Sequence, residues 1–383
     1  MRVLMVRWMA GLALMSVALS GMALDFEGIP EAPELPVKSY LVMDFATGEV
    51  IAESNADTRV EPASLTKIMT VYTVADGLAR GLIRLDDQPV VSEYAWKQEG
   101  SRMFIEVGKQ VSVEELLHGD IIQSGNDASV ALAEHLSGTE DVFASVMNEH
   151  AARLGMASSS FANSTGLPNP GTYTTARDMA RLARALVAEF PDTYRIFSEP
   201  EYTYNGITQR NRNGLLGRDP SVDGMKTGYT QAAGYCLVAS AVRDGMRLIS
   251  VVMGAESDGA RTQASRALLN YGFRFFESRQ LYAAKAPITT GKVWQGELDE
   301  VQVGLAEDLQ MLLPRADLGD NLKAVAELRK PLIAPLTEGQ EVGELMVSYK
   351  DKPLRTLPLV TLAAIPEGSW VKRAVDSVKL MME

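Results

Sequence analysis

Residues 235–253 read YCLVASAVRDGMRLISVVM. Two apolar runs rich in β-branched residues flank Asp244-Gly245, a dipeptide typical of the tight turn between antiparallel strands. We therefore expect a β-hairpin here. Residues 264–276, which follow, have one strongly apolar face at helical spacing. A strand pair and a helix are thus predicted in direct succession.

The residues upstream of this hairpin extend the pattern. Residues 40–54 alternate around a turn at Thr47-Gly48 and predict another hairpin. Three stretches between the two hairpins have apolar residues at helical spacing: 64–79, 127–136 and 140–154. The order strands, helices, strands, helix predicts an α+β domain, which we place at residues 24–277.

The chain changes character after residue 277. Short alternating apolar runs, separated by Pro and Gly, predict a small all-β domain over residues 278–364. Residues 365–383 contain a helical pattern with Trp370 on an apolar face and several cations opposite, which is typical of a helix lying in a membrane interface. The alternative is a helix packed back on the protein. The terminal position and the local positive charge favour the membrane.

The first 23 residues predict a cleaved export signal. Arg2 and Arg7 precede an apolar run at 8–19, and small residues follow at Gly21-Met22-Ala23. A retained membrane helix is less favoured, because the apolar run is short for a span. We expect residues 1–23 to be absent from the folded protein.

Composition excludes several classes of function. The chain has 383 residues and a net charge of −12 without a basic patch, which argues against a nucleic-acid partner. The single cysteine, Cys236, lies in an apolar run typical of a buried strand and excludes an internal disulfide. The three histidines, His118, His135 and His150, lack metal-ligand spacing, so no metal and no organic cofactor are expected.

Three short motifs carry the chemistry. Ser64-Leu65-Thr66-Lys67 is an S-x-x-K motif, Ser124-Gly125-Asn126 is an S-x-N motif, and Lys226-Thr227-Gly228 is a K-T-G motif. Each alone has an ordinary explanation as a helix cap, a loop or a solvated charge. All three in this order, each in a suitable local context, favour a serine acyl-transfer enzyme.

The chemistry requires these residue types. A serine hydroxyl is a poor nucleophile until a base removes its proton. Lys67 lies three residues after Ser64 on one helix face and can be that base if it is neutral. Burial and a second positive charge, which Lys226 can supply, both lower the pKa of a lysine. The helix start at Ser64 also favours a developing oxyanion.

The other motif residues suit a peptide substrate. Ser124 can relay a proton, and Asn126 can hold a substrate amide. If Lys226-Thr227-Gly228 belongs to an edge strand, an extended peptide can pair along it. Gly228 would let that backbone approach closely.

The chain resembles a low-molecular-mass penicillin-binding protein of the penicillin-binding protein 5 type, a D-alanyl-D-alanine carboxypeptidase of peptidase family S11. The resemblance covers nearly the whole chain, and four segments carry it: 62–67, 123–128, 223–228 and 272–277. It implies a β-lactamase/transpeptidase-like catalytic domain, with an antiparallel sheet flanked by helices, followed by a small β domain and an amphipathic C-terminal helix.

The resemblance also implies roles for individual residues. Ser64 would be the acylated nucleophile and Lys67 its base, with the backbone N–H groups of Ser64 and Tyr229 as the oxyanion hole. Thr227 and an arginine would bind the substrate carboxylate. Arg261 matches the family's arginine best. Three further positions carry weaker implications: Arg212 resembles a second family arginine, Asp178 a structural acid, and Tyr229 departs from the histidine that some relatives have.

The function that the resemblance implies is removal of the terminal D-alanine from the peptidoglycan pentapeptide, with acylation of Ser64 by β-lactams. The expected location is the periplasm, on the outer face of the cytoplasmic membrane, through the C-terminal helix. Endopeptidase, transpeptidase or weak β-lactamase activity and a non-enzymatic wall-binding scaffold are the alternatives. A class A β-lactamase needs a glutamate on the loop between S-x-N and K-T-G, and the corresponding stretch here, residues 161–175, contains none.

Overall fold

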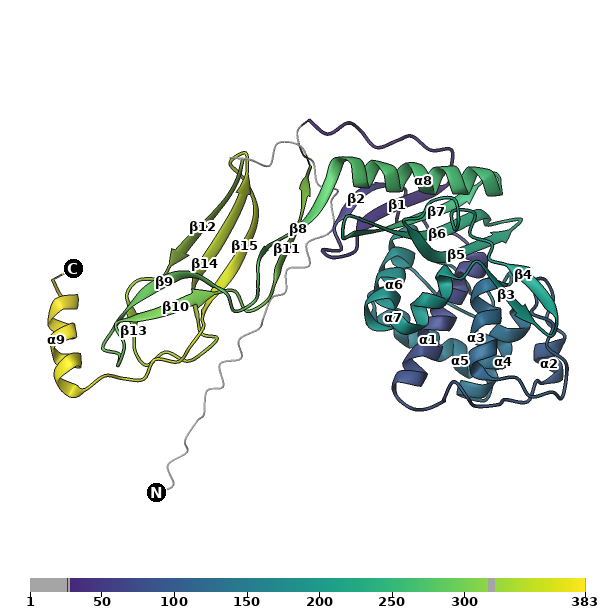
Figure 1. The fold of residues 1–383 in the computed structure, drawn as a ribbon, viewed down its shortest axis with the longest axis horizontal. Helices are drawn as coiled ribbons and strands as arrows, with labels where there is room; N and C mark the ends of the chain where they lie inside the picture. Colours follow the sequence, from purple (N-terminus) through teal and green to yellow (C-terminus); the bar gives the residue numbers. More distant parts are fainter. Residues whose placement is uncertain (1–25, 27, 316–320, 383) are drawn as a thin grey trace, which may run out of the picture.

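The structure is a computed structural model that describes residue 26 and residues 28–315 and 321–382 (Figure 1). The predicted export signal at 1–23 lies outside the described residues. Within the described ranges, no helix combines the length and the apolar character needed to cross a membrane.

A five-stranded antiparallel sheet forms the centre of the N-terminal part, in the order β2-β1-β7-β6-β5. Its strands are β1 (Ser39–Asp44), β2 (Val50–Ser54), β5 (Val222–Thr230), β6 (Gly234–Arg243) and β7 (Met246–Ala255). The two predicted hairpins are confirmed as β1–β2 and β6–β7. The K-T-G motif lies in β5, which is an edge strand.

Helices cover both faces of this sheet. In Figure 1, α8 (Asp258–Phe275) lies on one face and the remaining helices of this part lie on the other. Those helices are α1 (Thr66–Ala79), α2 (Glu93–Trp96), α3 (Val113–Ile122), α4 (Asn126–Ser137), α5 (Glu140–Arg153), α6 (Ala176–Glu189) and α7 (Pro191–Tyr194). Two 3₁₀ turns, η1 (Ala63–Leu65) and η2 (Arg195–Ser198), and a small hairpin of β3 (Glu201–Tyr204) and β4 (Ile207–Arg210) complete it.

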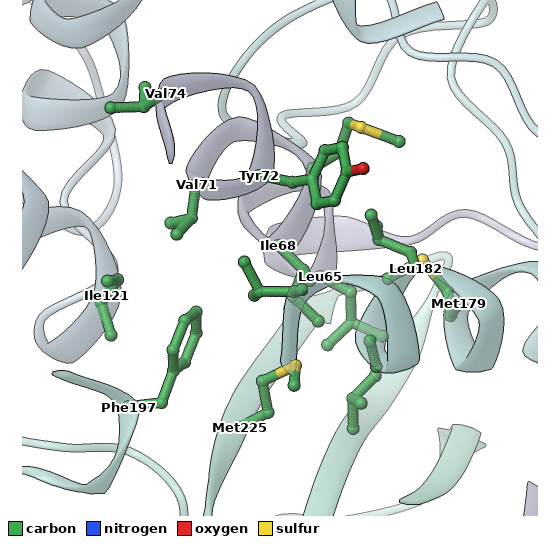
Figure 2. Close-up of a cluster of buried hydrophobic side chains, with 14 of the residues drawn as sticks. Leu65, Ile68, Val71, Tyr72, Val74, Ile121, Met179, Leu182, Phe197 and Met225 are labelled. Carbon is green, nitrogen blue, oxygen red and sulfur yellow. The ribbon is translucent and has the colours of Figure 1, made fainter. Parts of the chain in front are cut away.

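The alternation of side chains along the strands creates two cores. In β1, Leu41 and Met43 join the cluster beneath the helices, whereas Tyr40 and Val42 join the cluster under α8. Figure 2 shows the first cluster, in which side chains of α1 meet residues of α3, α6, η2 and β5. Because almost every residue of α1 is buried, the helix that follows Ser64 has a fixed position.

The C-terminal part is all-β. β8 (Phe276–Tyr282) follows α8 directly and pairs with β11 (Leu309–Pro314). The main sheet has the order β12-β14-β15-β10-β9-β13. Its strands are β9 (Pro287–Trp294), β10 (Glu300–Gly304), β12 (Leu322–Leu328), β13 (Leu332–Ile333), β14 (Glu341–Tyr349) and β15 (Lys352–Thr361).

The chain ends in α9 (Trp370–Leu380), which lies at the end of the molecule opposite the helical part (Figure 1). The predicted fold class, an α+β domain followed by a small β domain and a C-terminal helix, is confirmed.

Candidate active site

The S-x-x-K and K-T-G motifs meet at a close backbone contact. Ser64 lies in η1, the turn that leads into α1, and Gly228 lies opposite it in β5. A Cβ atom on Gly228 would stand 2.9 Å from the carbonyl oxygen of Pro62 and 3.2 Å from the backbone nitrogen of Leu65. Only glycine therefore lets the edge strand approach the turn that carries the nucleophile.

Lys67 joins the first motif to the second. Its side chain is fully buried, and its Nζ donates hydrogen bonds to Asn126 Oδ1 at 2.6 Å and to the Thr165 carbonyl oxygen at 2.7 Å. Burial lowers the pKa of Lys67 to about 8; the nearby carboxylate of Asp120 opposes that effect and the guanidinium of Arg212 adds to it. About one tenth of Lys67 is then neutral at pH 7, far more than for an ordinary lysine, as a base requires.

Lys226 is the second buried cation of the site. It is 3% exposed, and burial together with the positive charge of Lys67 lowers the pKa of Lys226 well below its usual value. The sequence predicts that Lys226 lowers the pKa of Lys67; both lysines are buried in the same site, and the effect found there is that of Lys67 on Lys226. The charge of Lys67 therefore makes Lys226 easier to deprotonate.

Ser124 occupies a strained position between α3 and α4. Its φ angle is +61°, it is 2% exposed, and no described residue forms a hydrogen bond with its hydroxyl. Left-handed backbone at a residue other than glycine, combined with a buried hydroxyl lacking a partner, is typical of functional sites. The hydroxyl is available to a substrate or to a transferring proton.

One carboxylate and one amide hold the loop beside this turn. Asp127 accepts hydrogen bonds from the backbone nitrogens of Met103, Phe104 and Ile105, at 2.9, 2.9 and 3.2 Å. Asn126 Nδ2 donates to the carbonyl oxygen of Glu99 at 2.6 Å. The Asn126 amide is therefore oriented by Lys67 on one side and by this loop on the other.

The loop before α6 covers the other side of η1. A Cβ atom on Gly166 would stand 1.9 Å from the carbonyl oxygen of Ala63. Glu140 of α5 holds this loop, since its Oε1 accepts from the backbone nitrogen and the hydroxyl of Ser164 at 2.9 and 2.5 Å. Its Oε2 accepts from the Tyr94 hydroxyl at 2.7 Å. Glu140 therefore joins α5 and α2 to this loop.

Asp178, which the resemblance marked as a structural acid, lies in the first turn of α6. Its Oδ2 accepts from the backbone nitrogen of Ser158 at 3.0 Å and from the Ser159 hydroxyl at 2.8 Å. Its carboxylate thus joins the start of α6 to the loop that follows α5.

The two candidate arginines differ in their partners. Arg261 of α8 donates to the carbonyl oxygens of Gly228 and Cys236 at 3.0 and 3.2 Å, and it pairs with Asp258. Arg212, between β4 and β5, makes no hydrogen bond or ion pair with any described residue. Burial and the charge of Arg261 lower the pKa of Arg212. Arg261 thus braces the edge strand, and Arg212 has an unengaged guanidinium.

The end of β5 is open to solvent. Thr227 is 5% exposed, whereas Tyr229 is 55% exposed and its ring lies 4.3 Å from that of Tyr235, centroid to centroid. Cys236 is buried in β6, and burial raises the pKa of its thiol, as expected for a packing residue. No group of three or more His, Cys, Asp or Glu residues within the described ranges could hold a metal ion.

Sequence reasoning missed two contributors to the site. Thr165 binds Lys67 through its backbone carbonyl. Any residue has such a carbonyl, so the amino-acid sequence gives no sign of this contact. Asp120 acts electrostatically on both lysines. Asp120 could have been noticed in the sequence. It lies beside Leu116, Leu117 and Ile121 on the buried side of α3, where a charged residue is unusual.

Comparisons with known proteins match both parts of the chain. A family model described as D-alanyl-D-alanine carboxypeptidase matches residues 27–257, and one described as the penicillin-binding protein 5 C-terminal domain matches residues 276–367. The D-alanyl-D-alanine carboxypeptidase DacC of Escherichia coli K12 is 44% identical over 358 residues, which cover 91% of this chain and 89% of the relative.

Solved structures give the same result. Penicillin binding protein 5 from Haemophilus influenzae matches with a TM-score of 0.83 and 39% identity, over 88% of this chain and 100% of that one. Penicillin-binding protein D2 from Listeria monocytogenes, in its ampicillin-bound form, matches with a TM-score of 0.56 and 30% identity, over 64% of this chain and 100% of that one. The chain therefore belongs to the D-alanyl-D-alanine carboxypeptidase family of serine hydrolases, as its resemblance to that family implied.

Proposed function

We propose that this protein removes the terminal D-alanine from peptidoglycan stem peptides through an acyl-enzyme on Ser64. One observation carries the assignment of roles. Lys67, one helical turn after Ser64, is fully buried with a pKa lowered to about 8, beside a second buried lysine. A buried lysine that is easily deprotonated is the base that a serine nucleophile needs.

The reaction proceeds in two steps. Neutral Lys67 takes the proton of Ser64 Oγ while the oxygen attacks the carbonyl carbon of the penultimate D-alanine. The backbone N–H groups of Ser64 and Tyr229 bind the oxyanion. The C–N bond then breaks, the departing D-alanine nitrogen takes a proton through Ser124, and water later hydrolyses the ester. The buried Ser124 hydroxyl, which lacks a partner in the described structure, supports the relay.

Substrate binding uses the outer edge of β5. An extended peptide pairs with this edge strand, and Asn126 orients its amide. Thr227 and an arginine receive the terminal carboxylate. Arg212 has the free guanidinium for this contact, and Arg261 keeps the carbonyl of Gly228 in place. The two arginines therefore divide binding and bracing between them.

β-Lactams enter by the same attack on the lactam carbonyl, which makes Ser64 the acylated residue. The ampicillin-bound relative supports this reaction. Residues 161–175 contain no glutamate that could activate water as in a class A β-lactamase, so we expect slow hydrolysis of the penicilloyl ester. Endopeptidase and transpeptidase reactions share the acyl-enzyme and differ only in leaving group and acceptor.

We also infer that α9 binds the outer face of the cytoplasmic membrane. Its polar face contacts the β domain: Asp376 accepts from the backbone nitrogen of Gln295 at 2.8 Å, and Lys372 pairs with Asp299 at 2.5 Å. Its apolar face points away from these contacts, with Trp370 and Met381 75% and 87% exposed. A helix with this division of faces suits a membrane interface, and the export signal expected at 1–23 favours the periplasmic side.

The domain boundaries belong to the same proposal. An export signal at 1–23 would precede a catalytic domain at 24–277, a β domain at 278–364 and an anchor at 365–383. Limited proteolysis of the full chain, followed by mass spectrometry, would test the boundary near residue 277.

The activity is tested with full-length protein in detergent and a D-Ala-D-Ala-terminated peptide, by following free D-alanine. Ser64→Ala should abolish release and also prevent formation of a penicillin adduct. Ser250→Ala removes another buried hydroxyl, in β7, and should leave both unchanged. An adduct without D-alanine release would point to a transpeptidase or endopeptidase. If the unmodified protein gave neither D-alanine release nor an adduct, the result would support the alternative of a non-enzymatic wall-binding scaffold.

A further inference from the structure

A carboxylate lies buried beside the two active-site lysines and has no part in the mechanism above. Asp120, in α3, has no exposed surface. Its Oδ1 accepts a short hydrogen bond from the hydroxyl of Ser129 in α4, and its Oδ2 has no hydrogen-bond partner within the described structure. A buried carboxylate with an unsatisfied oxygen is costly. Stability alone therefore does not account for this residue.

The charges around Asp120 show what it acts on. Lys67 from α1 and Lys226 from β5 face it, and Asp127 of α4 is the nearby acid. Of the charged groups around Lys67, Asp120 has the strongest effect, followed by Arg212, Asp127 and Glu140. Lys226 is also affected by Arg212 and Arg261. Asp120 is thus the main counter-charge of a buried pair of lysines.

The hydrogen bonds of Ser129 suit both protonation states of Asp120. Ser129 Oγ lies within hydrogen-bonding distance of Asp120 Oδ1 and 2.9 Å from the carbonyl oxygen of Gly125, but it has only one proton to donate. When Asp120 is ionised, Ser129 donates to the carboxylate. When Asp120 is protonated, it donates to Ser129, which then donates to Gly125. Neither state leaves the hydroxyl without a partner.

This pair is connected to the S-x-N turn. Gly125, the middle residue of that motif, accepts from Ser129 and also donates its own N–H to the carbonyl oxygen of Gly119 at 3.0 Å. The turn that positions Ser124 and Asn126 is therefore hydrogen-bonded to Ser129, the same residue that hydrogen-bonds Asp120.

We propose that Asp120, held by Ser129, is a positioning residue that acts through Lys67 and Lys226: its buried charge sets the pH range in which this lysine pair accepts the proton of Ser64. The proposal rests on the proposed function of Ser64 and Lys67. Burial raises the pKa of Asp120 to about 6, and Lys67 opposes that rise. Asp120 is therefore ionised where Lys67, with its pKa near 8, begins to lose its proton.

The direction of the effect follows from the charges. A negative charge stabilises protonated Lys67 and so raises the pKa of that lysine. Removal of the charge lowers the pKa, and Lys67 stays neutral to a lower pH. The acid limb of the acylation rate must then move toward lower pH, while the rate on the alkaline plateau changes little.

The test is the pH dependence of acylation of the full-length protein by a fluorescent penicillin, from pH 5.5 to 9.5. Asp120→Asn should lower the midpoint by on the order of one pH unit, and keep the plateau within about threefold of the unmodified protein. Ser129→Ala leaves the charge but removes a hydrogen bond that lowers the pKa of Asp120. It should shift the midpoint in the same direction by a smaller amount.

Asp44→Asn is the matched control. Asp44 is also fully buried, with one oxygen bound by Thr47 and the other lacking a partner in the described structure, but neither lysine is among the charges that act on it. Its replacement should leave the midpoint unchanged.

Each outcome decides the proposal. An unchanged midpoint in Asp120→Asn, even with a lower rate at every pH, would make Asp120 a packing residue and overturn the inference. If that variant does not fold, Ser129→Ala decides alone, by a lowered or an unchanged midpoint. Absence of any adduct on the unmodified protein would instead overturn the proposed function itself.

Discussion

Lys67 Nζ and Asn126 Oδ1 lie 2.6 Å apart, although 59 residues separate them in the chain. This contact joins the S-x-x-K helix to the S-x-N turn and leaves the base without exposed surface. Because Lys67 is fully buried, its pKa depends strongly on the charges around it. The acylation rate should therefore depend on pH and on the type of side chain at this position.

Lys67→Arg should reduce the rate of acylation by penicillin by a factor of about 10² to 10⁴. Arginine keeps the positive charge and can donate hydrogen bonds, but it is not deprotonated in proteins and so cannot act as the base. Stopped-flow fluorescence measures the rate, and a thermal melt checks that the fold persists. A variant that is acylated at the unmodified rate would exclude Lys67 as the base.

The acylation rate of the unmodified protein should depend on pH. Because Lys67 must be neutral, and burial lowers its pKa to about 8, the rate should rise about tenfold per pH unit below this value and level off above it. The logarithm of the rate plotted against pH gives the midpoint. A flat profile from pH 6 to 9 would contradict the assignment.

Gly228→Ala should destabilise the contact between β5 and η1. The added Cβ would meet the Pro62 carbonyl at 2.9 Å, so the strand must shift, at a cost of about 1–3 kcal/mol of unfolding free energy. We expect acylation to slow by on the order of 100-fold, because small displacements of a nucleophile are costly.

Gly259→Ala, in the first turn of α8, is the control for this substitution. Its nearest neighbour would be 3.9 Å from the new atom. Stability and acylation should stay close to those of the unmodified protein. Equal losses in the two variants would show that the contact between Gly228 and Pro62 is unimportant.

The two arginines should respond differently to replacement by glutamine. Arg212→Gln should raise KM for a D-Ala-D-Ala peptide by about 10- to 100-fold, the value of a hydrogen bond to a charged group, with little change in Tm. Arg261→Gln leaves the carbonyls of Gly228 and Cys236 unsatisfied. It should lower the unfolding free energy by about 1–3 kcal/mol. Steady-state kinetics and thermal melts of both variants check these expectations. A raised KM in Arg261→Gln with a lowered stability of Arg212→Gln would mean that the two roles are exchanged.

Replacement of Trp370 and Met381 by serine should weaken binding to anionic phospholipid vesicles by a factor of about 10² to 10⁴, because each buried apolar side chain contributes about 1.5–3 kcal/mol. Co-sedimentation measures binding. Leu82→Ser changes a side chain of the catalytic part that is 59% exposed and should have no effect. Unchanged binding of the double variant would show that α9 does not insert.

The sequence predicts the parts of the site that have a local signature. Helical spacing in residues 64–79 and alternation in 235–253 lead to α1 and to the hairpin beside β5. The close approach of Gly166 to Ala63, and the contact of Thr165 with Lys67, join segments about 100 residues apart through backbone atoms. No local periodicity encodes such contacts, because they depend on how the loop packs after the sheet and the helices have formed.

Asp120 is an intermediate case. Its position on the apolar side of a predicted helix marks it as unusual, but its effect on the two lysines depends on the packing of α1, α3 and β5. A polar residue in an apolar pattern can be recognised from sequence, and its partners require the fold.

The glycines on either side of η1 have a consequence for drug resistance. Gly166 and Gly228 leave no space for even one methyl group beside the turn that carries Ser64. A substitution at either position, selected by penicillins, would therefore displace Ser64 itself and impair the carboxypeptidase reaction as well. The side chain of Tyr229 is more than half exposed and can be replaced without such a clash, so escape mutations should arise there first.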